Sequence, residues 1–165
     1  MKRGLALAAL SVLAAGLFAG TAEAAGGPEN FRAHLTGAGE VPPVDTAAQG
    51  QAIFQLSPDD TALSYRLIVT NIENAVQAHI HCGAADVNGP VVAFLFGPVP
   101  EGMDNNGVLA TGTITNANVI PVPDSAACPG GVANFDEMIA KIRSGDAYVN
   151  AHTVQNPGGE IRGEL

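Results

Sequence analysis

The chain has 165 residues, with 16 acidic and 7 basic side chains and a formal net charge of −9. This length suits one domain with an ordinary hydrophobic core and leaves little room for a second domain. The acidic balance argues against nucleic-acid binding, because that affinity depends on clustered Lys and Arg that neutralise phosphates. A cationic partner or a metal ion suits the charge better.

The first 24 residues have the pattern of a secretory signal peptide. Lys2 and Arg3 precede an apolar run over residues 5–18, and a small-x-small cleavage sequence follows at residues 22–24. We predict cleavage after Ala24, export to the periplasm or the extracellular space, and a single domain over residues 25–165. No later segment approaches the roughly 20 apolar residues of a membrane span, so we predict no membrane attachment after cleavage.

Alternating apolar and polar residues predict short β-strands along most of the remaining chain. Strands are expected over residues 31–36, 50–56, 62–69, 76–82, 91–96, 108–114, 147–153 and 160–165. A turn over residues 57–60 predicts a hairpin, and a polar connection is expected over residues 71–75. The nearly continuous apolar run at residues 91–96 predicts a central strand covered on both faces. Residues 97–107 show little periodicity and are expected to be a mobile loop.

One helix is predicted after Asn134, which can cap its first turn with Glu137 three residues on. The apolar residues of this segment share one face, and Gly145 is expected to end the helix. Many short strands with one short helix predict a mainly β fold, an antiparallel β-sandwich or barrel with Greek-key-like connections.

All four histidines lie in predicted strands, and three of them form a candidate site. His79 and His81 are two residues apart, which places both imidazoles on one face of a strand, and His152 lies in the strand over residues 147–153. Three neutral imidazoles from adjacent strands can bind Cu(II) or Zn(II), with water or a fourth side chain completing the coordination. A solvated histidine face is the alternative interpretation.

Four further residues are assigned supporting roles around this predicted site. His34, Met103 and Asp86 are candidates for a fourth ligand, of which the first two rank below water. Asn150 shares a strand face with His152 and is predicted to make an orienting contact.

The two cysteines, Cys82 and Cys128, are expected to form a disulfide in an oxidising compartment, and a thiolate metal ligand is the alternative. A bridge would close a loop of roughly 45 residues and stabilise the fold by about 3 to 4 kcal/mol. Glu160 and Arg162 lie on one face of the last predicted strand and are expected to form a surface ion pair of about 0 to 1 kcal/mol.

Five segments in this order resemble the CHRD domain, named for chordin. The segments are Glu40–Pro43, Ala78–His81, Asn88–Val92, Tyr148–Thr153 and Gly158–Gly163, and the likeness extends over residues 31–165. The resemblance implies an extracytoplasmic, β-rich module of the kind found in bacterial exported proteins.

The histidines also resemble, more distantly, the copper ligands of copper-zinc superoxide dismutase. His79 and His81 are similar to its His-x-His pair, His152 to its lone ligand and Arg162 to its C-terminal arginine, which gives Arg162 an implied place near the metal. The bridging histidine and the zinc-binding cluster have no counterpart in the sequence. The likeness therefore implies a copper-type site and argues against dismutase catalysis.

Three functions follow from these interpretations. The leading hypothesis is an exported, non-enzymatic binding module that holds a copper or zinc ion on His79, His81 and His152. The second is a metal-free structural or adhesive domain whose loops at residues 97–107 and 116–131 bind a protein or glycan. The third is a redox enzyme of the superoxide dismutase type.

Overall fold

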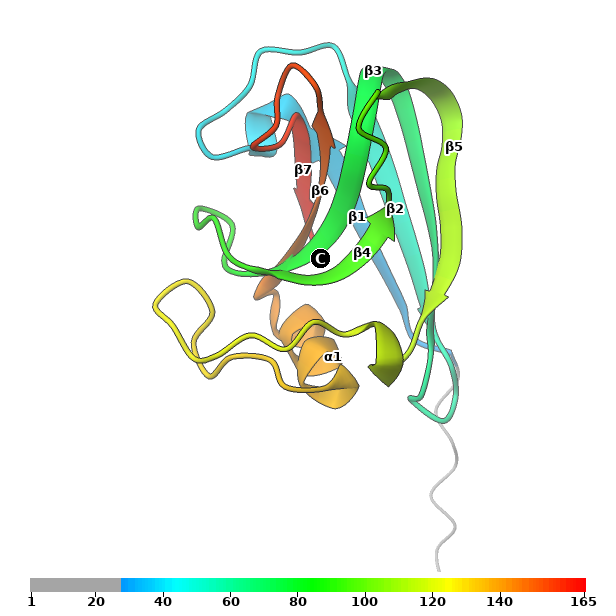
Figure 1. Cartoon of the computed structure of the whole chain (residues 1–165). Coiled ribbons are helices and arrows are strands. Elements are labelled where there is room, and N and C mark those ends of the chain that lie inside the picture. Colours follow the sequence, from blue (N-terminus) through cyan, green and yellow to red (C-terminus); the bar gives the residue numbers. More distant parts are fainter. Residues whose placement is uncertain (1–27) are drawn as a thin grey trace, which may run out of the picture.

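A computed structural model describes residues 28–165, so the predicted signal peptide lies outside the described residues. Seven strands and one α-helix follow each other along this part of the chain (Figure 1). They are β1 Asn30–Thr36, β2 Gln49–Leu56, β3 Leu63–Cys82, β4 Val91–Phe96, β5 Met103–Ile114, α1 Phe135–Ser144, β6 Ala147–Thr153 and β7 Ile161–Glu164, with short 3-10 turns at Gly37–Gly39 and Asn116–Asn118. Within residues 28–165, no helix is long and apolar enough to cross a membrane.

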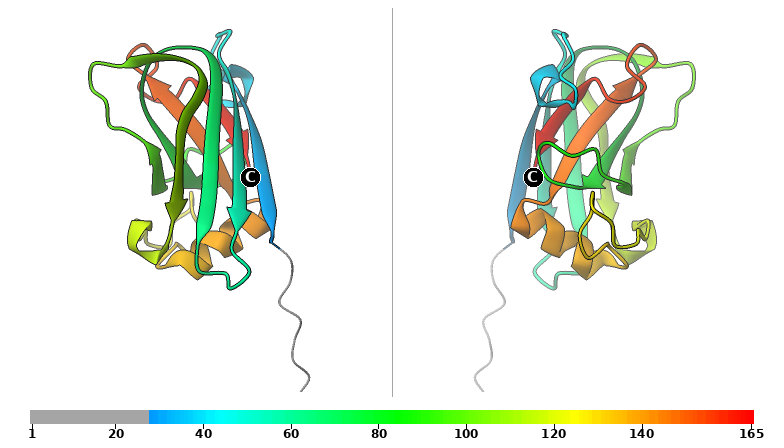
Figure 2. Two further views of the ribbon diagram at one scale, coloured as in Figure 1. Left: turned by 90° about the vertical axis from the view of Figure 1, so that its right-hand side faces the viewer. Right: turned by 90° about the vertical axis from the view of Figure 1, so that its left-hand side faces the viewer.

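Five of the strands close into an antiparallel barrel. The hydrogen-bonded order β2-β1-β7-β6-β3 is closed by a further pairing between β2 and β3, while β4 and β5 pair with β3 outside this ring. The two side views show the closed ring, with α1 at the end from which the chain enters β1 (Figure 2). The prediction of a mainly β antiparallel barrel with one short helix is confirmed.

Strand β3 is the longest element, with 20 residues. The polar connection expected over residues 71–75 is wrong, because the chain continues through it as strand. Asn71 and Asn74 have positive φ angles of 53°, and the pairing register with β5 shifts on both sides of Ile72. Such irregularities bend a strand. The first part of β3 therefore pairs with β2 and β5, and the second part carries His79 and His81 to β6 and β4.

Strands β4 and β5 also differ from the prediction. β4 is not central: it pairs only with β3, and Phe94 is 44% exposed. Val92, Ala93 and Leu95 are buried, while Phe94 packs its half-exposed ring against His79. β5 begins at Met103, so residues 103–107 of the expected loop are part of a strand.

The helix and the disulfide agree with the prediction. Asn134 caps α1 by accepting a hydrogen bond from the backbone N–H of Glu137 at 3.0 Å, and Gly145 ends it in the left-handed conformation. The disulfide between Cys82 and Cys128 joins the end of β3 to the irregular segment over residues 116–131, and both cysteines are fully buried. This bridge fixes the point at which the histidine-bearing end of β3 leaves the barrel.

Candidate metal centre

The outward face of β3, β6 and β7 carries a buried polar layer. Every residue of β6 is buried, which requires cover on both faces of this strand. Its alternate apolar residues belong to the barrel core, while Tyr148, Asn150 and His152 point to the opposite face. On that face Asn150 lies between His79 of β3 and Arg162 of β7 in the pairing register. The sheet thus places the histidines outside the barrel, beneath the loops that surround it.

The three histidines predicted as ligands converge in this layer. Their side chains are only 3% exposed for His79, 7% for His81 and 6% for His152. His79 Nδ1 lies 3.1 Å from His152 Nε2, and one ring nitrogen of each residue lies within 4.8 Å of the others. A tetrahedral ion bound at about 2.0 to 2.1 Å holds its nitrogens roughly 3.3 Å apart. One pair already has this spacing, and the third imidazole needs a movement on the order of 1 Å.

Two loop carbonyls determine which nitrogens carry protons. His81 Nδ1 lies 2.8 Å from the carbonyl of Gly89, and His152 Nδ1 lies 3.0 Å from the carbonyl of Pro157. Because a carbonyl only accepts, both Nδ1 atoms donate, and the Nε2 atoms of these rings bear no proton. His152 Nε2 then accepts from His79 Nδ1. The Nε2 atoms of His79 and His81 are buried without a hydrogen-bond partner among residues 28–165.

The histidines are uncharged at neutral pH. Burial lowers the pKa of His79 to about 3, and the neighbouring imidazoles of His152 and His81 lower it further in the same direction. Burial likewise lowers the pKa of His81 to about 4, opposed by its bond to the Gly89 carbonyl, and it lowers the pKa of His152. Neutral imidazole is the form that binds metal ions, so the three rings can bind one without a net loss of protons, provided that the His79 proton moves from Nδ1 to Nε2 and frees the nitrogen that faces His152.

Aromatic rings enclose two of the histidines. The Phe94 ring meets His79 edge to face at a centroid distance of 4.4 Å, and Tyr148 stacks on His81 at 4.7 Å. Arg162 lies on the Tyr148 ring, with its guanidinium carbon 3.3 Å from the ring centroid. A cation on the face of a tyrosine is a favourable arrangement, and here it places the positive charge behind the ring that covers His81.

Arg162 holds the loop that supplies the Gly89 carbonyl. Its guanidinium donates to the carbonyl of Ala84 at 2.8 Å, to Asn88 Oδ1 at 3.4 Å and to Glu164 Oε1 at 3.2 Å, and the residue is 1% exposed. The expected surface ion pair with Glu160 is therefore wrong, because the guanidinium is buried and bonds to other groups. Its contact with the histidine site runs through the Tyr148 ring.

Glu160 is also buried, at 7% exposure, and is bonded to three other side chains. Its Oε1 accepts from Thr46 Oγ1 at 2.7 Å, and its Oε2 accepts from Thr153 Oγ1 at 2.6 Å and from Asn156 Nδ2 at 3.2 Å. The carboxylate thus joins the segment after β1 to the turn between β6 and β7.

Sequence reasoning missed Glu40, a buried carboxyl beside this layer. Glu40 is 5% exposed, and its Oε1 has no hydrogen-bond partner in the part of the chain that the structure describes. Burial raises its pKa to about 7, opposed by the charge of Arg162 and a polar contact with Asn150. Asn150 pairs with His79 in the sheet, and its Oδ1 is a further buried atom without a hydrogen-bond partner among residues 28–165. The only sequence signal was the Glu-Val-Pro-Pro segment shared with the resembled family.

The residues predicted as a fourth ligand lie apart from the three histidines. His34 is exposed on β1 and Asp86 is exposed in the loop after β3, and neither belongs to the histidine group. Met103 is 39% exposed on β5, where it pairs with Ala75. Asn150 shares the strand face with His152, as its position in the strand predicted, but the expected orienting hydrogen bond is not among the bonds of residues 28–165, where its Oδ1 has no partner.

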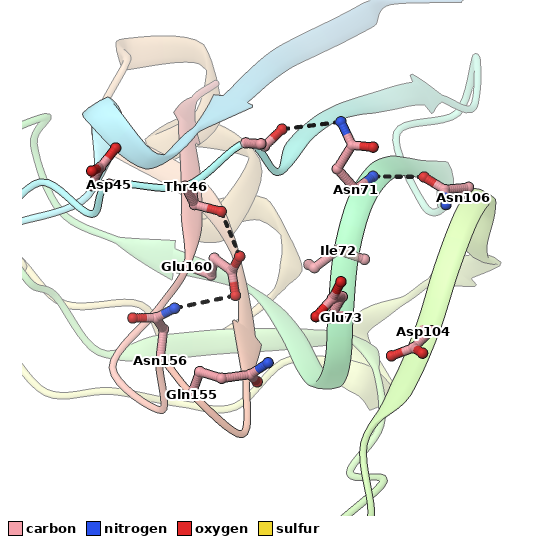
Figure 3. A pocket seen from close by; sticks show the side chains of 11 residues that line it. Asp45, Thr46, Asn71, Ile72, Glu73, Asp104, Asn106, Gln155, Asn156 and Glu160 are labelled. Carbon is pink, nitrogen blue, oxygen red and sulfur yellow. Dashed lines mark hydrogen bonds between the residues drawn. The ribbon is translucent and has the colours of Figure 1, made fainter.

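An acidic cavity of about 590 Å³ lies on the other side of the β6–β7 turn (Figure 3). The carboxylates of Asp45, Glu73 and Asp104 line it and are exposed, and Glu160 forms its buried wall. Figure 3 shows the bonds from Thr46 and Asn156 that occupy both Glu160 oxygens. Glu160 is therefore a structural wall of this cavity and not a free ligand within it.

One comparison with known proteins gives a match. A family model described as the CHRD domain matches residues 31–165, which is most of the chain. No curated protein and no solved structure matches. The resemblance to superoxide dismutase is accordingly supported by none of the comparisons.

Proposed function

The chain belongs to the CHRD domain family, and we propose that it is an exported binding module that holds one copper or zinc ion on His79, His81 and His152. The observation that carries this proposal is the convergence of three buried, neutral imidazoles whose ligand atoms lie within 4.8 Å of one another. Export is supported by the signal-like N-terminus and by the disulfide, a bond typical of oxidising compartments.

The unpaired nitrogens favour a bound ion over a metal-free role. Buried polar atoms in folded proteins almost always have a partner, and leaving one unpaired costs about 1 to 3 kcal/mol. Here two buried Nε2 atoms lack a partner in the described residues, and both belong to the same cluster. An ion bound to His81 Nε2 would pair that nitrogen, while His79 would bind it through Nδ1, the atom 3.1 Å from His152 Nε2.

The donor set favours copper or zinc. Imidazole is a preferred ligand of both ions, whereas calcium and magnesium require oxygen ligands. Both His81 and His152 donate their second ring nitrogen to a backbone carbonyl, an arrangement that commonly orients metal-binding histidines. The burial of all three rings behind Phe94, Tyr148 and the loops suits holding an ion more than turning over a substrate.

Metal titration tests the proposal. The exported protein, stripped with a chelator, is expected to bind one equivalent of Cu(II) or Zn(II), and His79→Ala or His152→Ala is expected to weaken binding at least about 100-fold. His34→Ala is the matched control, because this histidine is exposed on β1 and outside the cluster.

Binding that both cluster variants retain would refute the assignment, as would an absence of stoichiometric binding by the unmodified protein. Superoxide turnover measured on the copper-loaded protein decides the enzymatic alternative, and a rate no faster than that of free copper would dismiss it.

A further inference from the structure

Glu160 is the centre of a hydrogen-bond network that holds the turn between β6 and β7. Its two oxygens accept from Thr46 on one side and from Asn156 on the other (Figure 3), and the second oxygen also accepts from Thr153. Thr153 Oγ1 in turn accepts from the backbone N–H of Asn156 at 3.0 Å. Both ends of the turn are therefore attached to one buried carboxylate.

The same turn presents the Pro157 carbonyl to the metal site. The Asn156 carbonyl accepts from the backbone N–H groups of Thr153 at 3.3 Å and Gly159 at 3.0 Å, which closes the turn around residue 157. The Pro157 carbonyl lies 3.0 Å from His152 Nδ1. The position of this carbonyl depends on the turn, and the turn depends on Glu160.

We propose that Glu160 is a positioning residue of the metal centre: through the turn it holds the Pro157 carbonyl on His152 Nδ1, keeps the proton there and leaves His152 Nε2 bare toward His79. The effect of Glu160 on metal affinity rests on the proposed function. Its effect on the His152 tautomer is expected in the metal-free protein as well.

The effect of Glu160 is confined to one of the three ligands. His81 receives its carbonyl from Gly89, in a loop held by Arg162 and by the Tyr148 hydroxyl, which accepts from the backbone N–H of Gly89 at 3.1 Å. These bonds do not involve the β6–β7 turn. A change at Glu160 is expected to alter His152 and leave the tautomer of His81 as it is.

Glu160→Gln is the test variant, since glutamine has nearly the same shape but replaces one accepting oxygen by an amide that donates. Glu73→Gln is the matched control, because Glu73 lines the same cavity and carries the same charge but is exposed and outside the network. Long-range proton–nitrogen NMR of the metal-free proteins reports the tautomer of each histidine. We expect Glu160→Gln to give a mixture of His152 tautomers and Glu73→Gln to give the wild-type spectrum.

Metal affinity gives the second measurement. Cu(II) binding is expected to weaken about 10- to 100-fold in Glu160→Gln, the range found when outer partners of metal ligands are removed. The same substitution in a His152→Ala background is expected to change the affinity less than twofold, since the two residues act as one unit. Thr153→Val removes the shortest bond to Glu160 and is expected to shift the tautomer in the same direction if Glu160→Gln does not fold.

An unchanged His152 tautomer in Glu160→Gln or its substitute would overturn the inference, as would an equal loss of affinity in the His152→Ala background. If the unmodified protein binds no metal ion, the proposed function fails, and the NMR result still decides the role of Glu160.

Discussion

Replacing Glu40 by glutamine is expected to stabilise the metal-free protein at neutral and alkaline pH. The pKa of Glu40 is about 7 in the folded protein and 4.5 in a model compound. An acid with a raised pKa binds its proton more tightly in the folded state, so ionisation destabilises the fold above pH 4.5 and reaches its full effect above pH 7. At about 1.4 kcal/mol per pKa unit, the cost of the ionised Glu40 is up to about 3 kcal/mol at pH 8.

As the pH falls, protonation of the histidines lowers the free energy of unfolding, whereas protonation of Glu40 raises it. The pKa values of His79 and His81 are lowered from 6.5 to about 3 and about 4, so the unfolded chain takes up these protons first and folding is weakened below pH 6.5. Between pH 7 and pH 5 each contributes a loss of about 2 kcal/mol, and protonation of Glu40 returns about 2 kcal/mol over the same interval. These three groups together give a loss of about 2 kcal/mol in the unmodified protein and about 4 kcal/mol in Glu40→Gln, and the lowered pKa of His152 adds to the loss in both.

Urea unfolding in the presence of a chelator, followed by circular dichroism at pH 5, 6, 7 and 8, measures both effects. Glu40→Gln is expected to have the higher free energy of unfolding at pH 8 and the steeper decline toward pH 5. Glu73→Gln, which removes an exposed carboxylate, is the control and should follow the unmodified protein. A Glu40→Gln variant with the wild-type stability at pH 8 and the wild-type pH profile would refute the reasoning.

Three further predictions follow from the same structure. Metal binding should persist below pH 6.5, where protonation of ordinary imidazoles begins to displace a metal ion, because burial lowers the pKa values of His79 and His81. Titration with Cu(II) at pH 5.5 and 7 checks this. Replacing both Cys82 and Cys128 by serine opens a loop with a sequence separation of 46 and should cost about 4 kcal/mol in urea unfolding. Ile80→Val shortens a fully buried side chain between two ligands and should cost about 0.5 to 1.5 kcal/mol, with metal affinity within about twofold, since Ile80 faces the core.

The strands and the helix could be predicted because local periodicity determines them. Asn134 and Gly145 bound the helix as their side-chain chemistry requires, and the strand over residues 147–153 was predicted with the correct bounds. The continuity of β3 could not be predicted, because Asn71 and Asn74 are polar residues with positive φ that resemble a loop in the sequence. Pairing with β5 and β6 holds the chain on the two sides of this bend, and at the bend the backbone N–H groups of Asn71 and Asn74 donate to side chains of β5.

In the candidate site, too, one part could be predicted from the sequence and another could not. The spacing of His79 and His81 places them on one strand face, and the register of β3 with β6 then brings His152 beside them. The charged residues around them could not be predicted, because their partners come from loops with no periodic signal. Glu160 and Arg162 illustrate this: their spacing suggests a mutual ion pair, but Glu160 bonds to Thr46 while Arg162 bonds to Ala84.

The outward position of the site explains why loops control its chemistry. Inside the barrel, the residues that alternate with the ligands, such as Ala78, Ile80 and Ala151, are fully buried aliphatic side chains that leave no room for an ion. On the outside the strands supply only the imidazoles, and the loops supply the carbonyls of Gly89 and Pro157 that fix their protons. The barrel therefore sets the spacing of the three histidines, while the loops set which of their nitrogens carry protons. If the proposed ion binds there, loop changes are expected to alter its affinity with little effect on the core, because the two sets of contacts lie on opposite faces of the same strands.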